Sequence, residues 1–303
     1  MQCRGRIMAI YLEDFTFLSE RTEYDITSSE TRTCFNSLYP CRIFPQKGMR
    51  RLEFDNITIL YGGNGSGKST ALNIMAAKMR LLRDIPFNPT NFFGEYVEAT
   101  DFNSSRYADS KGIPQESRIL CSEDVFDRTL TIRAQNHGIN AKREDVAQEW
   151  GDINNRGGGQ RRLTTIHGPA FEAYKRTYEI QRKSMSMMIR AEVGFNVQTG
   201  SNGENSFNFF LEKIRAGALY LLDEPEDSLS AKWQVKLATL LEGMARFEKC
   251  QFVIATHSPF LLGIQGAKIY DLDTKGVPVR KWTELENVRE YFDFFQARKG
   301  EFE

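Results

Sequence analysis

The segment Gly62–Ser69 has the residue types and spacing of a loop that binds phosphate, Gly-x-x-x-x-Gly-Lys-Ser. Glycines let backbone N–H groups turn toward an anion that a side chain would keep at a distance. The Lys68 ammonium can reach the β- and γ-phosphates of a nucleotide, and the Ser69 hydroxyl can bind Mg²⁺. We also expect Lys68 to lie at the surface, so that its loss leaves no buried partner. The expected nucleotide-binding residues here are Gly62, Gly63, Asn64, Gly65, Ser66, Gly67, Lys68, Ser69 and Thr70.

The residues on either side of this loop have the patterns of a strand and a helix. Asn56–Tyr61 is a short run of β-branched and apolar residues, which is typical of a buried strand. After the loop, Leu72, Met75 and Met79 recur at helical spacing. The start of such a helix adds unpaired N–H groups and a positive dipole end to a phosphate site. This strand–loop–helix context favours a phosphate loop over an ordinary glycine-rich turn.

Two acidic residues follow another apolar run, Leu219–Leu222. At the end of a buried strand, Asp223 is suited to hold the Mg²⁺ shell through water. Glu224 follows directly, and a carboxylate there could polarise the water that attacks the γ-phosphate. The alternative interpretation is that the two acids only begin a helix.

A third apolar run, Phe252–Ala255, leads to His257. A single histidine is more often structural than functional. However, His257 follows the Asp-Glu pair by one strand–helix unit, which favours a position beside the same phosphate site.

Four motifs in this order resemble those of the ABC-type ATPases, and among them the RecF- and SMC-like soluble branch. They are the phosphate loop, LLDEP at Leu221–Pro225, SLS at Ser228–Ser230 and ATHS at Ala255–Ser258. The TGSNGENSF and ATHSPFLL segments are similar to small stand-alone bacterial AAA-type ATPases, many of them linked to anti-phage defence or toxin systems. The likeness covers residues 52–80 and 199–272.

The resemblance implies an α/β fold, that of a P-loop NTPase of the ABC type. It implies that Lys68 and the loop backbone hold the phosphates of ATP. Ser69 and Asp223 would hold Mg²⁺. Glu224 would be the general base, and His257 would sense the γ-phosphate.

Ser201, Gly203 and Glu204 occupy the place of the family's signature motif, before an expected helix that contains Phe207. In the family, this motif contacts the γ-phosphate held by the opposite subunit, so two chains enclose two ATP molecules head to tail. The match lacks the family's second glycine. A loop that only caps its helix is the alternative interpretation.

The family's metal-contacting glutamine has no clear counterpart in this chain. Ser122 and Glu123 fall nearest to its place, after a predicted strand. An importer ATPase would need that glutamine loop and a membrane partner, so the departure argues against this class. The insertion is also too short for the long coiled coil of the DNA-repair relatives.

Strands that alternate with helices predict a mainly parallel sheet with an inserted helical lobe. The expected parts are residues 1–126 as the N-terminal part of the ATPase domain, 127–197 as the lobe, and 198–303 as the C-terminal part. We expect one short strand near Tyr96–Ala99. In the lobe we expect a long helix from Pro169. One apolar stripe along this helix is expected to pack in the core. It consists of Phe171, Tyr174, Tyr178, Met185 and Met188.

The whole chain has 40 basic and 40 acidic residues, so its net charge predicts no attraction to nucleic acid or membrane. Locally, Arg156–Arg190 has eight basic residues against two acidic ones. This segment could contact nucleic acid or an acidic partner, or be a solvated helix face. The chain lacks an apolar run of membrane-spanning length and a secretory segment, and its five cysteines show no metal-ligand spacing. We expect a cytoplasmic protein with reduced thiols.

Together with the motifs, the resemblance implies an ATPase that converts ATP and water to ADP and phosphate with Mg²⁺, as a head-to-tail homodimer. Its helical lobe would pass a conformational change to a separate effector protein, such as a nuclease or toxin, or to nucleic acid, in bacterial defence. The alternative is an ATP-gated scaffold that hardly hydrolyses ATP and restrains a toxin or nuclease partner.

Overall fold

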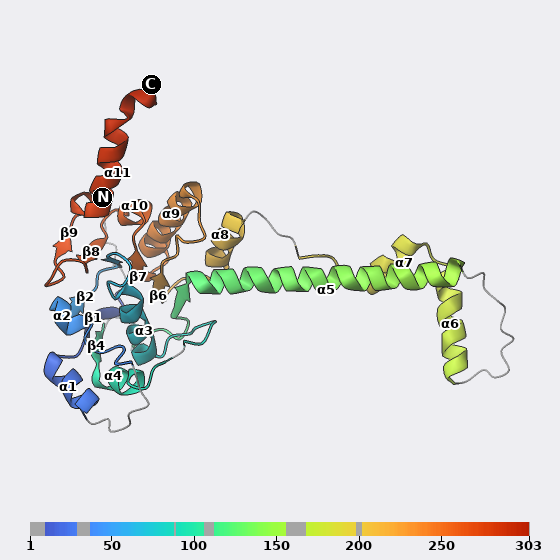
Figure 1. The fold of residues 1–303 in the computed structure, drawn as a ribbon, viewed down its shortest axis with the longest axis horizontal. Helices are drawn as coiled ribbons and strands as arrows, with labels where there is room; N and C mark the ends of the chain where they lie inside the picture. Colours follow the sequence, from blue (N-terminus) through green and yellow to red (C-terminus); the bar gives the residue numbers. More distant parts are fainter. Residues whose placement is uncertain are drawn as a thin grey trace, which may run out of the picture. The chain divides into compact units, whose positions relative to one another are not determined.

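The computed structural model describes residues 10–28, 37–87, 89–105, 112–155, 168–197 and 202–302 (Figure 1). The chain divides into two compact units. The larger unit consists of residues 1–126 and 201–303, and the smaller unit of residues 127–200.

A six-stranded sheet forms the centre of the larger unit, in the order β5-β6-β7-β3-β8-β9. Its strands are β3 (Ile57–Tyr61), β5 (Arg118–Cys121), β6 (Leu219–Asp223), β7 (Gln251–Thr256), β8 (Lys268–Asp271) and β9 (Val279–Arg280). All neighbours pair in parallel except β8 and β9. Every residue of β3 and β7 is buried, as expected for central strands covered on both faces. The sheet confirms the predicted α/β fold class.

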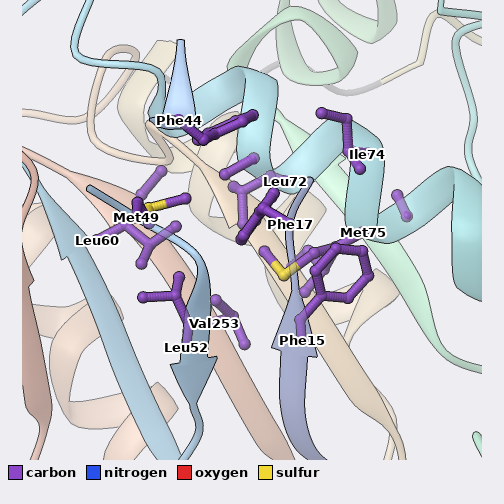
Figure 2. Close-up of a cluster of buried hydrophobic side chains, with 14 of the residues drawn as sticks. Phe15, Phe17, Phe44, Met49, Leu52, Leu60, Leu72, Ile74, Met75 and Val253 are labelled. Atoms are coloured by element: carbon purple, nitrogen blue, oxygen red, sulfur yellow. The ribbon is translucent and has the colours of Figure 1, made fainter. Parts of the chain in front are cut away.

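Helices and two apolar clusters cover this sheet. The helices of the larger unit are α1 (Glu20–Ser28), α2 (Phe44–Lys47), α3 (Lys68–Met79), α4 (Phe93–Ala99), α8 (Asn202–Lys213), α9 (Ala231–Phe247), α10 (Pro259–Leu262) and α11 (Glu286–Ala297), with short 3₁₀ turns at Trp282–Glu284 and Lys299–Glu301. In one cluster, Leu72 and Met75 of α3 pack with Phe15 and Phe17 (Figure 2). The second cluster includes Phe210 of α8 and residues of α9.

A small antiparallel sheet adjoins the first cluster, in the order β2-β1-β4. Its strands are β1 (Leu12–Thr16), β2 (Arg51–Glu53) and β4 (Asp101–Ser104). The strand predicted near Tyr96–Ala99 is wrong, because these residues belong to α4. Tyr96 is fully buried there, and its ring lies 6.4 Å from that of Phe44.

The smaller unit is helical in its described part. It contains most of α5 (Ser122–Asn155), together with α6 (Pro169–Gln181) and α7 (Met185–Glu192). Arg176 donates to both Glu149 and Glu192, with nitrogen–oxygen distances of 2.6 Å, and so links the three helices. Nearby, Val146, Ile180, Met188 and Val193 form a small core.

Two expectations for this lobe are wrong. The single long helix is interrupted, because Ser184 caps the start of α7 by accepting from the Met187 N–H. The predicted core stripe is mostly exposed: Tyr174 is 45% and Tyr178 is 50% exposed, and of its five residues only Met188 lies in the small core. The helix packs instead through Ile180. Arg156, Arg161 and Arg162 of the basic segment lie outside the described residues.

None of the helices in the described part of the chain has the length and apolar character needed to cross a membrane.

Candidate nucleotide site

The expected phosphate loop joins β3 to α3, and its geometry requires glycine at positions 62, 65 and 67. Gly65 and Gly67 have φ angles of +79° and +93°, in the left-handed region that side chains disfavour. A Cβ on Gly62 would lie 2.6 Å from Ser66 Oγ, and one on Gly67 would lie 2.8 Å from the Ile43 methyl. The loop therefore cannot hold this shape with larger residues, and its amides precede the N terminus of α3, where anions bind.

Lys68 is buried, contrary to the expectation from sequence, with an exposed fraction of 4%. Its ammonium donates to the carbonyl oxygens of Gly62 at 2.7 Å and Gly63 at 3.1 Å. It also lies 3.2 Å from Glu224 Oε1. The lysine thus has three partners, and one of them is a carboxylate from the predicted catalytic pair.

Ser69 and Asp223 lie in contact, although 154 residues separate them. The Ser69 hydroxyl donates to Asp223 Oδ1 at 2.9 Å, which joins α3 to the end of β6. Burial raises the pKa of Asp223 to about 6, against the opposing effect of the Ser69 hydrogen bond. A hydroxyl and a partly buried carboxylate fit the oxygen donors that Mg²⁺ takes from a protein when phosphates and water supply the rest.

A cavity of about 500 Å³ lies beside this pair. Ser69, Asp223 and Glu224 line it. Ser122 and Glu123, which fall nearest to the family's glutamine, line the same cavity. Both therefore lie beside the Ser69–Asp223 pair.

Glu224 begins the turn after β6 with an unusual backbone. Its φ angle is +45°, and its N–H donates to the Ala255 carbonyl of β7 at 2.9 Å. Such strain in a non-glycine residue is concentrated at functional sites. His257 Nδ1 lies 3.9 Å from Glu224 Oε1, so the three groups expected to act on the γ-phosphate, Lys68, Glu224 and His257, lie together. A carboxylate in this position can accept a proton from water.

The signature-like residues are only partly described. Ser201 lies outside the described residues, whereas Gly203 and Glu204 lie in the first turn of α8. A Cβ on Gly203 would lie 2.8 Å from the Trp233 ring of α9, so packing within the chain already requires a glycine here. The Ser228–Ser230 turn leads directly into α9.

Sequence reasoning missed three side chains around this site. Glu226 is buried beneath the histidine segment, Asp273 accepts from the Gly63 N–H at 2.8 Å, and the Tyr39 and Thr70 hydroxyls lie 3.2 Å apart. A second acid just after LLDEP was the available signal for Glu226. No local pattern marked Tyr39 or Asp273, which come from distant parts of the chain.

Residues 189–263 match a family model described as AAA domain, putative AbiEii toxin, Type IV TA system. This segment is about a quarter of the chain and includes Asp223, Glu224 and His257. No curated protein matches the chain. The match confirms the predicted similarity to AAA-type ATPases over that segment.

Similar solved structures have low sequence identity. One is an inward-facing putative metal-chelate type ABC transporter, at 16% identity over 78% of each chain and a TM-score of 0.32. Another is cbiO1 from Clostridium perfringens, part of the ABC transporter complex cbiONQ, at 14% identity over 83% of this chain and 88% of that chain, with a TM-score of 0.31. A third is the SMC head domain from Thermotoga maritima, at 16% identity over 74% of this chain and 89% of that chain, with a TM-score of 0.33. TM-scores this low add no support for a function. By its ordered motifs and its family match, the chain resembles an ABC-type ATPase of the RecF- and SMC-like branch.

Proposed function

We propose that the protein binds ATP with Mg²⁺ and hydrolyses it to ADP and phosphate. The observation that carries this proposal is the double contact between the phosphate loop and the end of β6. Ser69 donates to Asp223 at 2.9 Å, and Lys68 lies 3.2 Å from Glu224. A metal-binding pair and a phosphate-binding cation beside a candidate base are the parts that phosphoryl transfer needs.

In the proposed mechanism, Lys68 and the loop amides bind the β- and γ-phosphates. Ser69 and Asp223 would hold Mg²⁺, which when bound would neutralise the charge that develops on the phosphates. When phosphate oxygens take up the Lys68 ammonium, its contact with Glu224 weakens. The Glu224 carboxylate is then free to accept a proton from the attacking water. His257 donates to the γ-phosphate.

The proposal includes a head-to-tail homodimer and a separate effector. Ser201, Gly203 and Glu204 would contact the γ-phosphate of the opposite chain, supported by the helix N terminus at Asn202. The effector would be a nuclease, a toxin or nucleic acid, with a role in bacterial defence, for which the family's description is the support. A scaffold that binds ATP but hardly turns it over is the alternative, and steady-state phosphate release separates the two.

The test is Glu224→Gln, which keeps the size of the side chain but cannot take a proton from water. We expect steady-state phosphate release to fall roughly 10²- to 10⁴-fold, while ATP binding survives. Lys68→Ala is the control, and should abolish binding of a fluorescent ATP analogue. Unimpaired turnover in Glu224→Gln would refute the base assignment.

The same variant tests the dimer. With hydrolysis blocked, Glu224→Gln should form a dimer at saturating ATP, measured by size exclusion with light scattering. Adding Ser201→Arg should break that dimer, because the larger side chain would fill the space for the opposite phosphate. A Glu224→Gln protein that stays monomeric would count against the head-to-tail arrangement.

A further inference from the structure

Glu226 is a buried carboxylate in the turn after β6, only 4% exposed. One of its oxygens, Oε1, accepts from the Thr256 hydroxyl at 2.5 Å. The same oxygen accepts from the backbone N–H groups of His257 at 2.9 Å and Ser258 at 3.1 Å. Burying a carboxylate is unfavourable unless hydrogen bonds compensate. Here all three compensating donors belong to the segment that carries the histidine.

The same oxygen also faces the ring of His257. Nδ1 lies 3.4 Å from Glu226 Oε1, closer than the 3.9 Å to Glu224. Glu226 therefore contacts both the backbone and the imidazole of one residue. A carboxylate at Nδ1 fixes the orientation of the ring and leaves Nε2 for a phosphate oxygen, to which Nε2 donates when both ring nitrogens carry a proton.

Two further contacts hold this segment. Ser258 Oγ donates to Gln234 Oε1 at 2.7 Å, and Gln234 Nε2 donates to the Leu229 carbonyl at 2.8 Å, so the turn after β6 is tied to the histidine segment a second time. On the other side, Asn287 Nδ2 of α11 donates to the His257 carbonyl at 2.9 Å. These hydrogen bonds would hold the backbone of His257 in place if Glu226 lost its charge. They do not reach the imidazole ring, which Glu226 contacts at Nδ1.

We infer that Glu226 is a positioning residue, which holds the His257 imidazole for its contact with the γ-phosphate and does not touch the nucleotide. This inference rests on the proposed function, and it names a residue that acts through His257. A side chain that only joined the ends of β6 and β7 would need the backbone and Thr256 contacts but not the one at Nδ1.

The test is a double-mutant cycle of Glu226→Gln and His257→Ala, with kcat and KM for ATP measured for all four proteins. Glutamine offers a neutral amide oxygen in the place of Oε1, so it keeps the contacts with Thr256 and the two N–H groups and removes only the negative charge that faces Nδ1. We expect Glu226→Gln to lower kcat about tenfold with KM within about twofold, a coupling of the size seen between contacting residues. In the His257→Ala background it should change kcat by less than about twofold.

Glu242→Gln is the matched control. Glu242 is also a carboxylate that accepts from a backbone N–H, that of Gln265 at 3.0 Å, but it lies on α9 away from the candidate site. This variant should keep wild-type kcat. If Glu226→Gln has wild-type kcat, or lowers it by the same factor in both backgrounds, the inference is overturned.

A measurement on the unmutated protein keeps the inference testable if Glu226→Gln fails to fold. Nitrogen-15 NMR of the histidine side chains reports which ring nitrogen carries a proton. The His257 signals are assigned by their loss in His257→Ala. We expect a proton on Nδ1, and an unprotonated Nδ1 would overturn the inference. Absence of ATP hydrolysis by the unmutated protein would refute the proposed function, whereas this spectrum tests the pairing of the ring with Glu226.

Discussion

Gln251, at the start of β7, links the two sheets of the larger unit. Its side chain is fully buried and makes four hydrogen bonds. Oε1 accepts from the N–H groups of Tyr11 at 2.7 Å and Leu12 at 2.8 Å, while Nε2 donates to the carbonyls of Leu12 at 2.8 Å and Asp55 at 3.1 Å. Leu12 belongs to the small sheet and Gln251 to the large one. The change that we consider is Gln251→Ala.

The expected loss follows from those four contacts. Each hydrogen bond contributes about 0.5 to 1.5 kcal/mol net, and a buried group left without its partner costs more, so the four together come to about 2 to 6 kcal/mol. We take about 4 kcal/mol as the expected loss. Domains of this kind have a free energy of unfolding of about 5 to 15 kcal/mol, so the loss is a large share. At about 2 to 4 °C per kcal/mol, the Tm should fall by about 8 to 16 °C.

Gln251→Glu separates the acceptor from the donor. The introduced carboxylate can still accept from Tyr11 and Leu12, but it faces the Leu12 and Asp55 carbonyls without a donor. Burial and these two carbonyls raise the pKa of the introduced carboxyl above its unfolded value of about 4.3. Its penalty should therefore be smallest below about pH 4.3 and grow as the pH rises through the folded-state pKa.

Differential scanning calorimetry at several pH values measures both variants against the wild type. The reasoning would be refuted if Gln251→Ala melted within about 2 °C of wild type, because three buried backbone groups and the partly buried Asp55 carbonyl cannot lose their partners at so small a cost. A Gln251→Glu protein whose stability did not improve on acidification would show that the donor half of the amide is unimportant.

Three further outcomes are expected. Gly67→Ala should weaken ATP binding at least about tenfold in a fluorescence titration, because alanine disfavours a φ angle of +93°. The control is Gly243→Ala in the middle of α9, where an added Cβ meets no atom within 4 Å, and this variant should leave binding unchanged. Burial raises the pKa of Cys121 to about 12, so iodoacetamide at pH 8 should alkylate it far more slowly in the native protein than in urea, as peptide mass spectrometry would show. If the basic segment binds nucleic acid, replacing Arg161 and Arg162 with alanine should flatten the slope of log affinity against log salt by up to about two units, and no binding at low salt would refute a nucleic-acid partner.

The sequence by itself determined the features that depend on local backbone and on contiguous residue patterns. The phosphate loop at Gly62–Ser69 could be recognised because the positive φ angles of Gly65 and Gly67 are local backbone requirements. The runs that became β3, β6 and β7 could be recognised because central parallel strands, buried on both faces, are continuously apolar. The predicted fold class followed from these elements.

Only the tertiary structure decided which side chains are buried and what they contact. Periodicity correctly placed Tyr174 and Tyr178 on one face of a helix, but α6 packs through the opposite face, with Ile180 in the small core and Arg176 paired to Glu149. Spacing along a helix shows which residues share a face, and says nothing about which face a neighbour covers.

The contacts of the candidate site were beyond the sequence for the same reason. Glu226 lies against His257 because β6 and β7 are adjacent in the sheet and end at the same edge. Lys68 is buried against Glu224 because β3, which leads into the phosphate loop, pairs with the other side of β7. Strand order decides that adjacency, and no local pattern of residues encodes it. The sequence therefore determined the chemical groups of the site, and the order of the strands decided which of them meet.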